Sequence, residues 1–290
     1  MHWKSATIQT LVRLAIKEDS AHHDITTLTL IPAPLKLEAQ IHAKGHGVVC
    51  GLAMAKACFK ALDPHCVFVA TAHDGQWVKP NALLVTIRDK ARAILSAERS
   101  ALNALQHLSG IATYTHSQVK QLNSRHTAIF DTRKTLPGWR ELQKYAVHCG
   151  GGKNHRMSLK TSVLIKDNHL QICRMVKADW IKAIKRLRRL HPSLPVEMEV
   201  QTPRDLKDAL HLGPHQVLLD NMSVSKLRRL VRDLRSQLPS AEIEISGGVR
   251  PEQLRALRGL GVERISMGRL THSAPAFDCS LDITRVFNPR

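Results

Sequence analysis

The sequence predicts an α/β protein whose second part is built on a parallel, barrel-like sheet. After residue 123, short runs rich in β-branched residues alternate with stretches of helical periodicity, which is the pattern of right-handed β-α-β units. Charged residues and glycines recur where these runs end, and the loops at that face of an α/β barrel build its active site. Six strands are fewer than eight, so we expect an incomplete barrel, or one whose gap a second domain covers.

The first part of the chain mixes helices and strands in no regular alternation. We expect, in order, helix 5–17, strand 37–44, helix 51–62, strand 66–71, strand 82–89 and a long helix 91–122. Asn123, Ser124 and Arg125 then break the helical pattern. The expected division is therefore one domain over 1–123 and a second over 124–290, with the last residues free to return to the first domain.

In the second part, polar residues follow almost every predicted strand. The strands are 127–131, 162–166, 196–200, 216–220, 242–246 and 264–268, and the helices are 138–148, 177–190, 203–211, 223–237 and 251–258. Their ends carry Asp131 with Arg133, then Lys166, Glu199, Asp220, Ser246 with Gly247 and Gly248, and Gly268. A polar residue after one strand is ordinary turn chemistry, but its recurrence predicts a shared site.

The formal net charge of +19 raises the question of nucleic acid. Much of this charge has a structural explanation, because 177–190 reads as an amphipathic helix with a solvated basic side. Two Tyr and five Phe also provide few stacking platforms for single strands. The excess charge either keeps the protein soluble or concentrates anionic substrates.

Cysteine spacing and the N-terminal stretch both favour a cytoplasmic protein. The six cysteines form no C-x-x-C pair and have no His partner at zinc-ligand spacing, so we expect reduced thiols. An apolar stripe near the N-terminus is cut off by Lys17, Glu18 and Asp19 before it could span a bilayer. No membrane association is expected.

Two motifs, DTRKTLPGW (131–139) and GGGKNHR (150–156), and the nearby IKDNH (165–169) bring basic residues together. An anion with several carboxylates or phosphates would suit such a group, whereas each residue alone could be an exposed charge. The five candidates are Arg133, Lys134, His155, Arg156 and Lys166. Asn154 stands where a Walker loop needs Ser or Thr, which argues against nucleoside-triphosphate binding.

The glycines of ISGGV (245–249) and SMG (266–268) are phosphate candidates, since backbone N–H groups can approach oxygens closely where side chains are absent. Two tight turns would also explain them, but their position within the barrel favours a phosphate site. Glu199 and Asp220 could hold a divalent cation, bind sugar hydroxyls, act as acid and base, or pair with a neighbouring Lys or Arg. Spacing does not separate these roles.

Several segments, taken in order, resemble the quinolinate phosphoribosyltransferase family over essentially the whole chain. They are KEDSAHHDITT, AERSALNALQHLSGIAT, DTRKTLPG, YAVHCGGGKNHRM, VLIKDNHL, VEMEV, LLDNM, EISGGV and ISMGRLTHS. The resemblance implies an N-terminal α/β sandwich domain, a C-terminal incomplete α/β (TIM-like) barrel and a homodimer. It implies a glycosyltransferase of NAD biosynthesis that converts quinolinate and phosphoribosyl pyrophosphate to nicotinate mononucleotide, pyrophosphate and carbon dioxide with Mg2+.

The resemblance also implies roles for individual residues. Quinolinate would contact Arg133, His155, Arg156, Lys166 and, from the partner subunit, Arg99. Lys134, Glu199 and Asp220 would face phosphoribosyl pyrophosphate and the metal, and the phosphate would lie against Ser246, Gly247, Gly248, Gly268 and His272. Lys134, Lys166, Glu199 and Asp220 are the expected catalytic residues.

Some positions depart from the family pattern, and two alternatives stay open. His148, Lys153, Ser158, Lys160 and Arg269 differ from the residues expected there, which affects substrate affinity more than the activity. A related phosphoribosyltransferase-like protein of molybdenum metabolism shares several motifs. A basic nucleic-acid-binding protein would explain the charge but not the ordered residues at the strand ends.

Overall fold

The computed structural model describes residues 5–287, and the chain divides into two compact units. Unit 1 contains the described residues up to His116, the segment Leu136–Gly151 and the residues from Ser273 onward. Unit 2 contains Ser117–Thr135 and Gly152–His272. The expected boundary after residue 123 falls inside unit 2, and the return of the C-terminal residues to unit 1 starts at Ser273.

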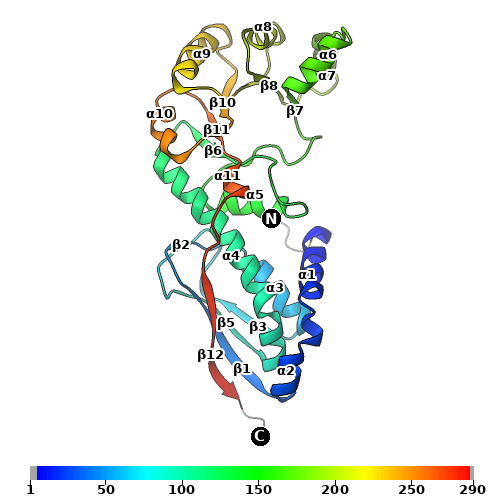
Figure 1. Cartoon of the computed structure of the whole chain (residues 1–290), viewed down its shortest axis with the longest axis vertical. Coiled ribbons are helices and arrows are strands. Elements are labelled where there is room, and N and C mark those ends of the chain that lie inside the picture. The colour runs from blue at the N-terminus through cyan, green and yellow to red at the C-terminus, as the bar shows by residue number, and fades with distance from the viewer. Residues whose placement is uncertain (1–4, 288–290) are drawn as a thin grey trace. The chain divides into compact units, whose positions relative to one another are not determined.

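Unit 1 is built on a four-stranded antiparallel sheet with the order β12-β1-β5-β3 (Figure 1). Its strands are β1 (Lys36–Ala43), β3 (Val67–Ala70), β5 (Leu83–Lys90) and β12 (Cys279–Phe287), with a small second sheet of β2 (Gly47–Val48) and β4 (Trp77–Val78). Its helices are α1 (Ala6–Glu18), α2 (Ile25–Leu30), α3 (Leu52–Leu62), α5 (Arg140–Cys149) and most of α4 (Ala91–Leu122).

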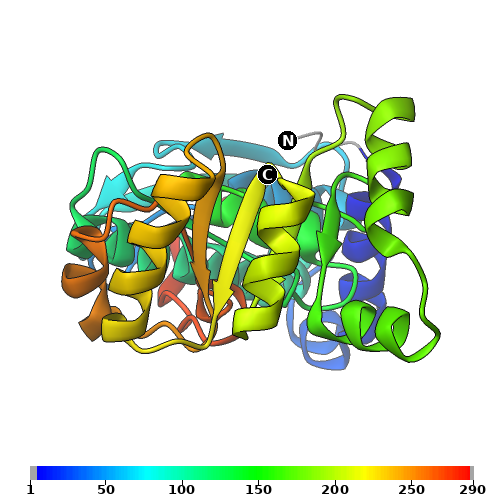
Figure 2. The same cartoon turned by 90° about the horizontal axis from the view of Figure 1, so that it is seen from above.

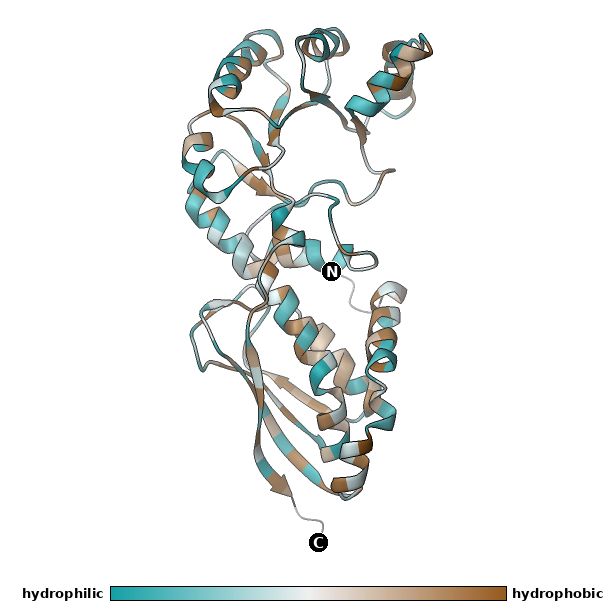
Figure 3. Cartoon of the chain, viewed as in Figure 1, coloured by the Kyte–Doolittle hydropathy of each residue, from teal (hydrophilic) through white to brown (hydrophobic). Residues whose placement is uncertain are grey.

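Alternation along β1 shows why this sheet has one buried face. Leu37, Ala39, Ile41 and Ala43 are at most 2% exposed, and the residues between them are half-buried. A strand turns successive side chains to opposite faces, so the buried set packs on one side. Figure 3 shows the same pattern as alternating brown and teal along the strands of this sheet.

Unit 2 is built on a six-stranded parallel sheet with the order β6-β11-β10-β9-β8-β7. Its strands are β6 (Ala128–Phe130), β7 (Val163–Ile165), β8 (Val196–Val200), β9 (Gln216–Asp220), β10 (Glu242–Ser246) and β11 (Arg264–Ser266). Its helices are α6 (Asp167–Met175), α7 (Trp180–Leu190), α8 (Pro203–Leu212), α9 (Val224–Gln237), α10 (Leu254–Arg258) and α11 (Arg269–His272).

The helices α8, α9 and α10 lie along the outer side of this curved sheet (Figures 1 and 2). β6 and β7 are its two edges, so the sheet forms an open, incomplete barrel. The α8 start shows the local logic: Thr202 accepts a hydrogen bond from the Asp205 backbone N–H, and Asp205 accepts one from that of Thr202, a capping box. The predicted α/β class with an incomplete barrel is confirmed.

The sequence pattern missed α2, α6 and β12 and the short elements β2, β4 and α11, and the predicted helix 177–190 starts only at Trp180. Its apolar face is less covered than expected, because α7 has no buried residue among the described side chains and Leu190 is 65% exposed. α6 begins within the IKDNH motif, where Lys166 is the residue before the first helical turn. Lys166 lies between the end of β7 at Ile165 and the start of α6 at Asp167, so it is held at the end of the sheet.

Candidate active site

The inner face of the unit 2 sheet is polar, whereas its outer face is apolar. Strand β8 is buried at all five positions, although it reads Val-Glu-Met-Glu-Val. Because side chains alternate, Val196, Met198 and Val200 share the face that packs on the helices, and Glu197 and Glu199 share the other. The register places Glu244 of β10 level with Arg264 of β11 on this inner face. The sheet therefore encloses charged groups.

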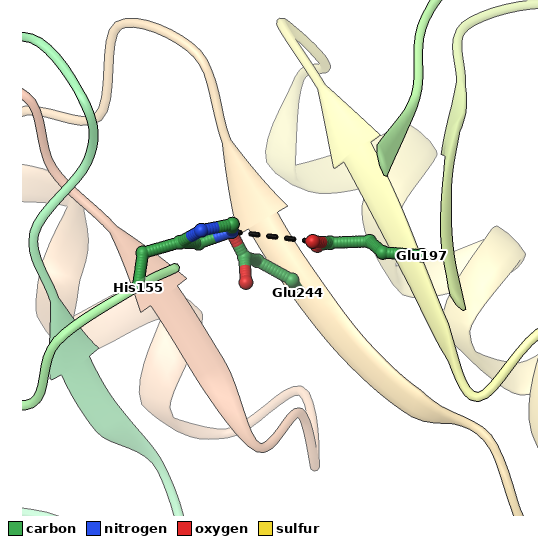
Figure 4. A group of neighbouring side chains, drawn as sticks. All are labelled: His155, Glu197 and Glu244. Carbon is green, nitrogen blue, oxygen red and sulfur yellow. Dashed lines mark ion pairs between the residues drawn. The ribbon is translucent and has the colours of Figure 1, made fainter. Parts of the chain in front are cut away.

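Figure 4 shows His155, Glu197 and Glu244 pointing toward one another from the GGGKNHR loop, β8 and β10. Nε2 of His155 lies 3.2 Å from Oε2 of Glu197 and 3.4 Å from Oε1 of Glu244. Burial lowers the pKa of His155, but the hydrogen bonds of both carboxylates outweigh this effect and raise it to about 9. Burial of the Glu197 carboxyl and the neighbouring Glu244 charge raise the pKa of Glu197.

Three further contacts hold this buried group. Nε of Arg264 lies 2.8 Å from Oε2 of Glu244, and the Arg264 guanidinium stacks 4.1 Å above the Phe130 ring. The backbone N–H of His155 donates to Oδ1 of Asp131, the fully buried residue that follows β6, at 2.9 Å. Glu197 of β8 and Glu244 of β10 thus contact the imidazole, while Arg264 of β11 contacts Glu244 and Asp131 binds the His155 backbone.

Arg133 and Arg156 place two guanidinium groups near each other at the same face. Burial lowers the pKa of Arg156, and the Arg133 charge lowers it further, which shows that the like charges interact. Nη1 of Arg156 donates to the Ser162 carbonyl oxygen at 2.9 Å. Nε of each arginine is buried and, within residues 5–287, has no hydrogen-bond partner. Buried donors of this kind are costly unless a ligand satisfies them.

Lys166, Glu199 and Asp220 form a third group at the strand ends. Nζ of Lys166 lies 3.6 Å from Oε2 of Glu199, and Nε2 of Gln201 donates to Oε1 of Glu199 at 2.6 Å. Burial raises the pKa of Glu199, and the Asp220 charge adds to the increase, whereas Lys166 lowers it. The two carboxylates are therefore close enough to repel, an arrangement that a divalent cation would relieve.

The turn after β10 needs glycine for steric reasons, and the glycine after β11 lies close to two side chains. Gly247 has a positive φ of 84°, and a Cβ there would lie 2.5 Å from the Asn221 backbone nitrogen. A Cβ on Gly268 would lie 3.0 Å from Cδ of Lys134 and 3.2 Å from Nε2 of His272. The backbone of Gly268 thus lies next to a cation and an imidazole, and that of Gly247 lies next to Asn221.

Ser246 ends β10 level with Asp220 of β9, and Gly248 also has a positive φ, 60°. The structure thus gathers most of the residues expected for the site in unit 2. Arg99 differs: it is an exposed residue of α4 in unit 1. Its charge lowers the pKa of Glu98 against the larger effect of burial, a local interaction that requires no partner subunit.

Sequence reasoning missed Glu197, Glu244 and Arg264 as members of this site. The signal was the spacing of two residues in VEMEV and EIEIS, which places acidic side chains on one face of neighbouring strands. The predicted site included only residues at the ends of the strands, whereas Glu197, Glu244 and Arg264 lie before those ends.

Comparison with known proteins agrees with this arrangement. Residues 24–109 match the family model described as quinolinate phosphoribosyl transferase, N-terminal domain, and residues 111–282 match that of the C-terminal domain. A probable carboxylating nicotinate-nucleotide pyrophosphorylase of Bacillus subtilis is 36% identical over 92% of this chain and 90% of its own length. The Mycobacterium leprae enzyme of that name is 37% identical over 94% and 95%.

A solved structure shows the same fold. The nicotinate-nucleotide pyrophosphorylase from Francisella tularensis superposes with a TM-score of 0.86 at 34% identity, covering 96% of both chains. No helix within residues 5–287 is both long and apolar enough to cross a membrane. The strand-end motifs, the two family models and the relatives that span nearly the whole sequence agree. The chain belongs to the quinolinate phosphoribosyl transferase family.

Proposed function

We propose that this protein transfers the phosphoribosyl group of phosphoribosyl pyrophosphate to the nitrogen of quinolinate and releases pyrophosphate and carbon dioxide. The product would be nicotinate mononucleotide, a precursor of NAD. The observation that carries the proposal is the pair of buried, unsatisfied Nε donors of Arg133 and Arg156 beside a polar barrel interior. Two like-charged guanidinium groups fit a ligand with two carboxylates, because each fork can pair with one of them.

We assign the two ends of the site to different substrates. Arg133, Arg156 and Lys166 would bind quinolinate, together with the His155 that the resemblance also names. The glycine turns would receive phosphate oxygens: Gly247 and Gly248 follow Ser246, and Gly268 lies beside Lys134 and His272. Gly247 supports this assignment most strongly, since its close approach to Asn221 excludes any side chain from the turn.

Glu199 and Asp220 fit a Mg2+ ion bound with phosphoribosyl pyrophosphate. Their hard carboxylate oxygens are the ligands Mg2+ prefers, and their mutual repulsion gives them reason to accept a cation. When bound, the ion would neutralise the pyrophosphate charge. Lys134 would supply a second positive charge toward the same leaving group, and Lys166 keeps Glu199 in place through the 3.6 Å ion pair.

Chemistry of this kind makes modest demands on the protein. Bond breaking at the anomeric carbon puts positive charge on the ribose and negative charge on pyrophosphate, which the carboxylates and Lys134 complement. After the pyridine nitrogen forms its bond, the cationic ring stabilises the electrons left by the departing carboxylate. Arg133 and Arg156 then mainly need to orient the ring.

The decisive experiment measures carbon dioxide release from carboxyl-labelled quinolinate by the purified protein. We expect release that depends on both phosphoribosyl pyrophosphate and Mg2+, with one nicotinate mononucleotide formed per carbon dioxide. Chelation of the metal should abolish it. A protein that forms no nicotinate mononucleotide from quinolinate would refute the proposal and favour the paralogue of molybdenum metabolism. The similarity to carboxylating enzymes over nearly the whole chain favours quinolinate.

Replacing either carboxylate of the proposed metal site should separate turnover from quinolinate binding. In Glu199→Ala and Asp220→Ala, we expect kcat to fall by about a hundredfold or more, because charge stabilisation of the leaving group is lost. Calorimetry should show that quinolinate still binds within about threefold of the unchanged protein, since the arginines that bind it remain. Full turnover at ordinary Mg2+ would remove both residues from the mechanism.

We further propose a homodimer in which Arg99 completes the quinolinate site of the partner subunit. The AERSALNALQHLSG segment supports this, and the exposure of Arg99 on α4 allows it. Arg99→Ala and Lys134→Ala homodimers should each be nearly inactive, whereas subunit exchange should create heterodimers with one site free of both lesions. Two affinity tags would confirm the exchange. Inactive heterodimers, or a fully active Arg99→Ala protein, would contradict the composite site.

We also propose that the protein works in the cytoplasm. The six cysteines are free, which suits a reducing compartment. Fractionation of the source cells, with the enzymatic assay as the marker, would test this location.

A further inference from the structure

Two cysteines of unit 1 are held close together beside helix α4. The backbone N–H of Cys50 donates to the Ser109 hydroxyl at 2.9 Å, and that hydroxyl donates to the Cys50 carbonyl oxygen at 3.1 Å. Gly150 follows Cys149 and packs so tightly on α4 that a Cβ there would lie 2.3 Å from the Ala112 carbonyl oxygen. Residues 109 and 112 are three apart and lie on one face of the helix. Both cysteines are therefore anchored at neighbouring positions of α4.

Asp74 ties the same two segments together. Its Oδ1 accepts from the backbone N–H groups of the two residues that follow Cys50, at 3.0 and 3.2 Å. Its Oδ2 accepts from the Tyr145 hydroxyl at 3.1 Å. Tyr145 lies four residues before Cys149 on α5, and residues four apart share a helix face. The carboxylate thus holds the start of α3 and the last turn of α5 against each other.

The two thiols differ in exposure and in charge. Cys50 donates a hydrogen bond to the Cys149 sulfur, and this bond, together with one from the Tyr145 hydroxyl, lowers the pKa of Cys149 against the opposing effect of burial. Burial raises the pKa of Cys50, and its bond to Cys149 raises it further. Cys149 is partly exposed, whereas Cys50 is fully buried. An accessible sulfur with thiolate character therefore lies beside a protonated one.

We propose that Cys50 and Cys149 form a redox-active pair, at which an oxidant of the peroxide class converts the two thiols to a reversible disulfide. Cys149 reacts with the oxidant, and Cys50 then closes the bond. The proposal goes beyond the transfer reaction and does not depend on it. Transient disulfides of this kind occur in reducing compartments, so the pair is compatible with the free state of all six cysteines.

The reaction balances with hydrogen peroxide as the oxidant. The Cys149 thiolate attacks one peroxide oxygen, so an S–O bond forms while the O–O bond breaks, and the leaving hydroxide takes a proton to become water. The Cys50 sulfur then attacks the sulfur of this sulfenic acid. An S–S bond forms as the S–O bond breaks, and the hydroxyl leaves with the Cys50 proton as a second water. Two thiols lose two electrons in all, and a dithiol reductant returns them.

The other four cysteines supply the controls for this reaction. Burial raises the pKa of Cys58, Cys66 and Cys279 to about 12, which keeps these thiols protonated and slow to react. Cys173 is partly exposed like Cys149 but lies on α6 in unit 2. Its oxidation therefore reports how readily the oxidant reaches an ordinary surface thiol.

Mass spectrometry of the unchanged protein tests the pair directly. The reduced protein is exposed to hydrogen peroxide for increasing times, and remaining thiols are blocked with N-ethylmaleimide in denaturant before trypsin digestion. We expect GHGVVCGLAMAK (45–56) linked to YAVHCGGGK (145–153), with dithiothreitol separating them. The link should form about threefold or more faster than Cys173 is oxidised, because the gain in thiolate outweighs the accompanying loss of nucleophilicity.

Single replacements separate the two steps. Cys50→Ala should stop the reaction at the Cys149 sulfenic acid, which dimedone traps and mass spectrometry locates. Cys149→Ala should leave Cys50 as a free thiol under the same exposure, because the attacking sulfur is gone. Cys173→Ala is the matched control and should form the linked peptides at the unchanged rate.

Several results would overturn the proposal. They are a link that forms no faster than Cys173 is oxidised, a bond from Cys149 to any other cysteine, and recovery of both thiols unmodified after Cys173 has reacted. Conversion of Cys149 to sulfinic acid while Cys50 stays free would also overturn it, since the closing step would then be absent. The measurements on the unchanged protein need no variant to fold. None of the experiments uses quinolinate or phosphoribosyl pyrophosphate, so their outcome is independent of whether the proposed activity is found.

Discussion

Side chains alternate between the two faces in both sheets of the molecule, but the faces differ in what they bury. In β1 of unit 1, alternation separates an apolar core from a half-exposed face, as in an ordinary one-sided sheet. In β8 of unit 2, both faces are buried, and alternation separates an apolar layer under the helices from a charged interior. The comparison teaches that the sheet of unit 1 buries one apolar face, whereas the sheet of unit 2 also buries charged side chains, at a cost in desolvation.

Arg133→Ala should give the largest effect and would confirm that unit 2 is specialised for binding. Loss of the guanidinium from a desolvated guanidinium–carboxylate pair typically costs about 2–5 kcal/mol of binding free energy. Calorimetry should therefore show severe loss of quinolinate affinity. Thermal stability should hold or rise slightly, because the repulsion with Arg156 disappears. An unchanged quinolinate affinity in a folded variant would show that Arg133 does not bind quinolinate.

Gly110→Ala should show the opposite pattern in unit 1. A Cβ on Gly110 would lie 2.1 Å from the Pro275 carbonyl oxygen, so the chain after α11 would have to shift away from α4. We expect the free energy of unfolding to fall by about 1–3 kcal/mol, despite the better helix propensity of Ala. Denaturant unfolding measures it. The control is Gly259→Ala, whose Cβ would meet nothing within 4 Å. Equal stability of the two variants would contradict tight packing between α4 and the segment around Pro275.

His107 should give the smallest effect, a pH dependence of stability that arises in unit 1. Burial lowers the pKa of His107, and Nε2 of Gln143 donates to its ring at 2.9 Å while Oε1 of Gln143 accepts from the Leu136 N–H. The unfolded chain therefore takes up this proton first as the pH falls below about 6.5, and stability is lost.

Comparison of His107→Gln with the unchanged protein at pH 7.5 and pH 5.5 would test this assignment. The variant should lose less stability over that interval, with a difference on the order of 1 kcal/mol, the typical net contribution of one hydrogen bond. Parallel pH profiles of melting temperature would show that the acid sensitivity comes from other groups.

The fold followed from sequence wherever periodicity was long or uninterrupted. The strands of residues 196–200, 216–220 and 242–246 were predicted to the residue, since apolar positions alternate in the first and last and form a short uninterrupted run in the second. α6 was missed because IKDNH was interpreted only as a ligand motif, and β12 because its pairing with β1 spans most of the chain. Strand ends led to Arg133, Lys166 and Asp220, but three-dimensional register was needed to find Glu197, Glu244 and Arg264 on the inner face.

The strand order of both sheets has a consequence for synthesis of the chain. β1 pairs with β5 on one side and with the late strand β12 on the other, and β6, within residues 5–287, pairs with no strand but β11, so each sheet has an early strand with an edge that a much later part of the chain covers. At roughly 5–20 residues per second, the wait between Phe130 and Arg264 lasts on the order of 10 s. Neither unit can complete its sheet while the ribosome is still translating the middle of the message. Until the last strands are made, each sheet keeps an unpaired edge, which is a site of aggregation in incompletely folded chains.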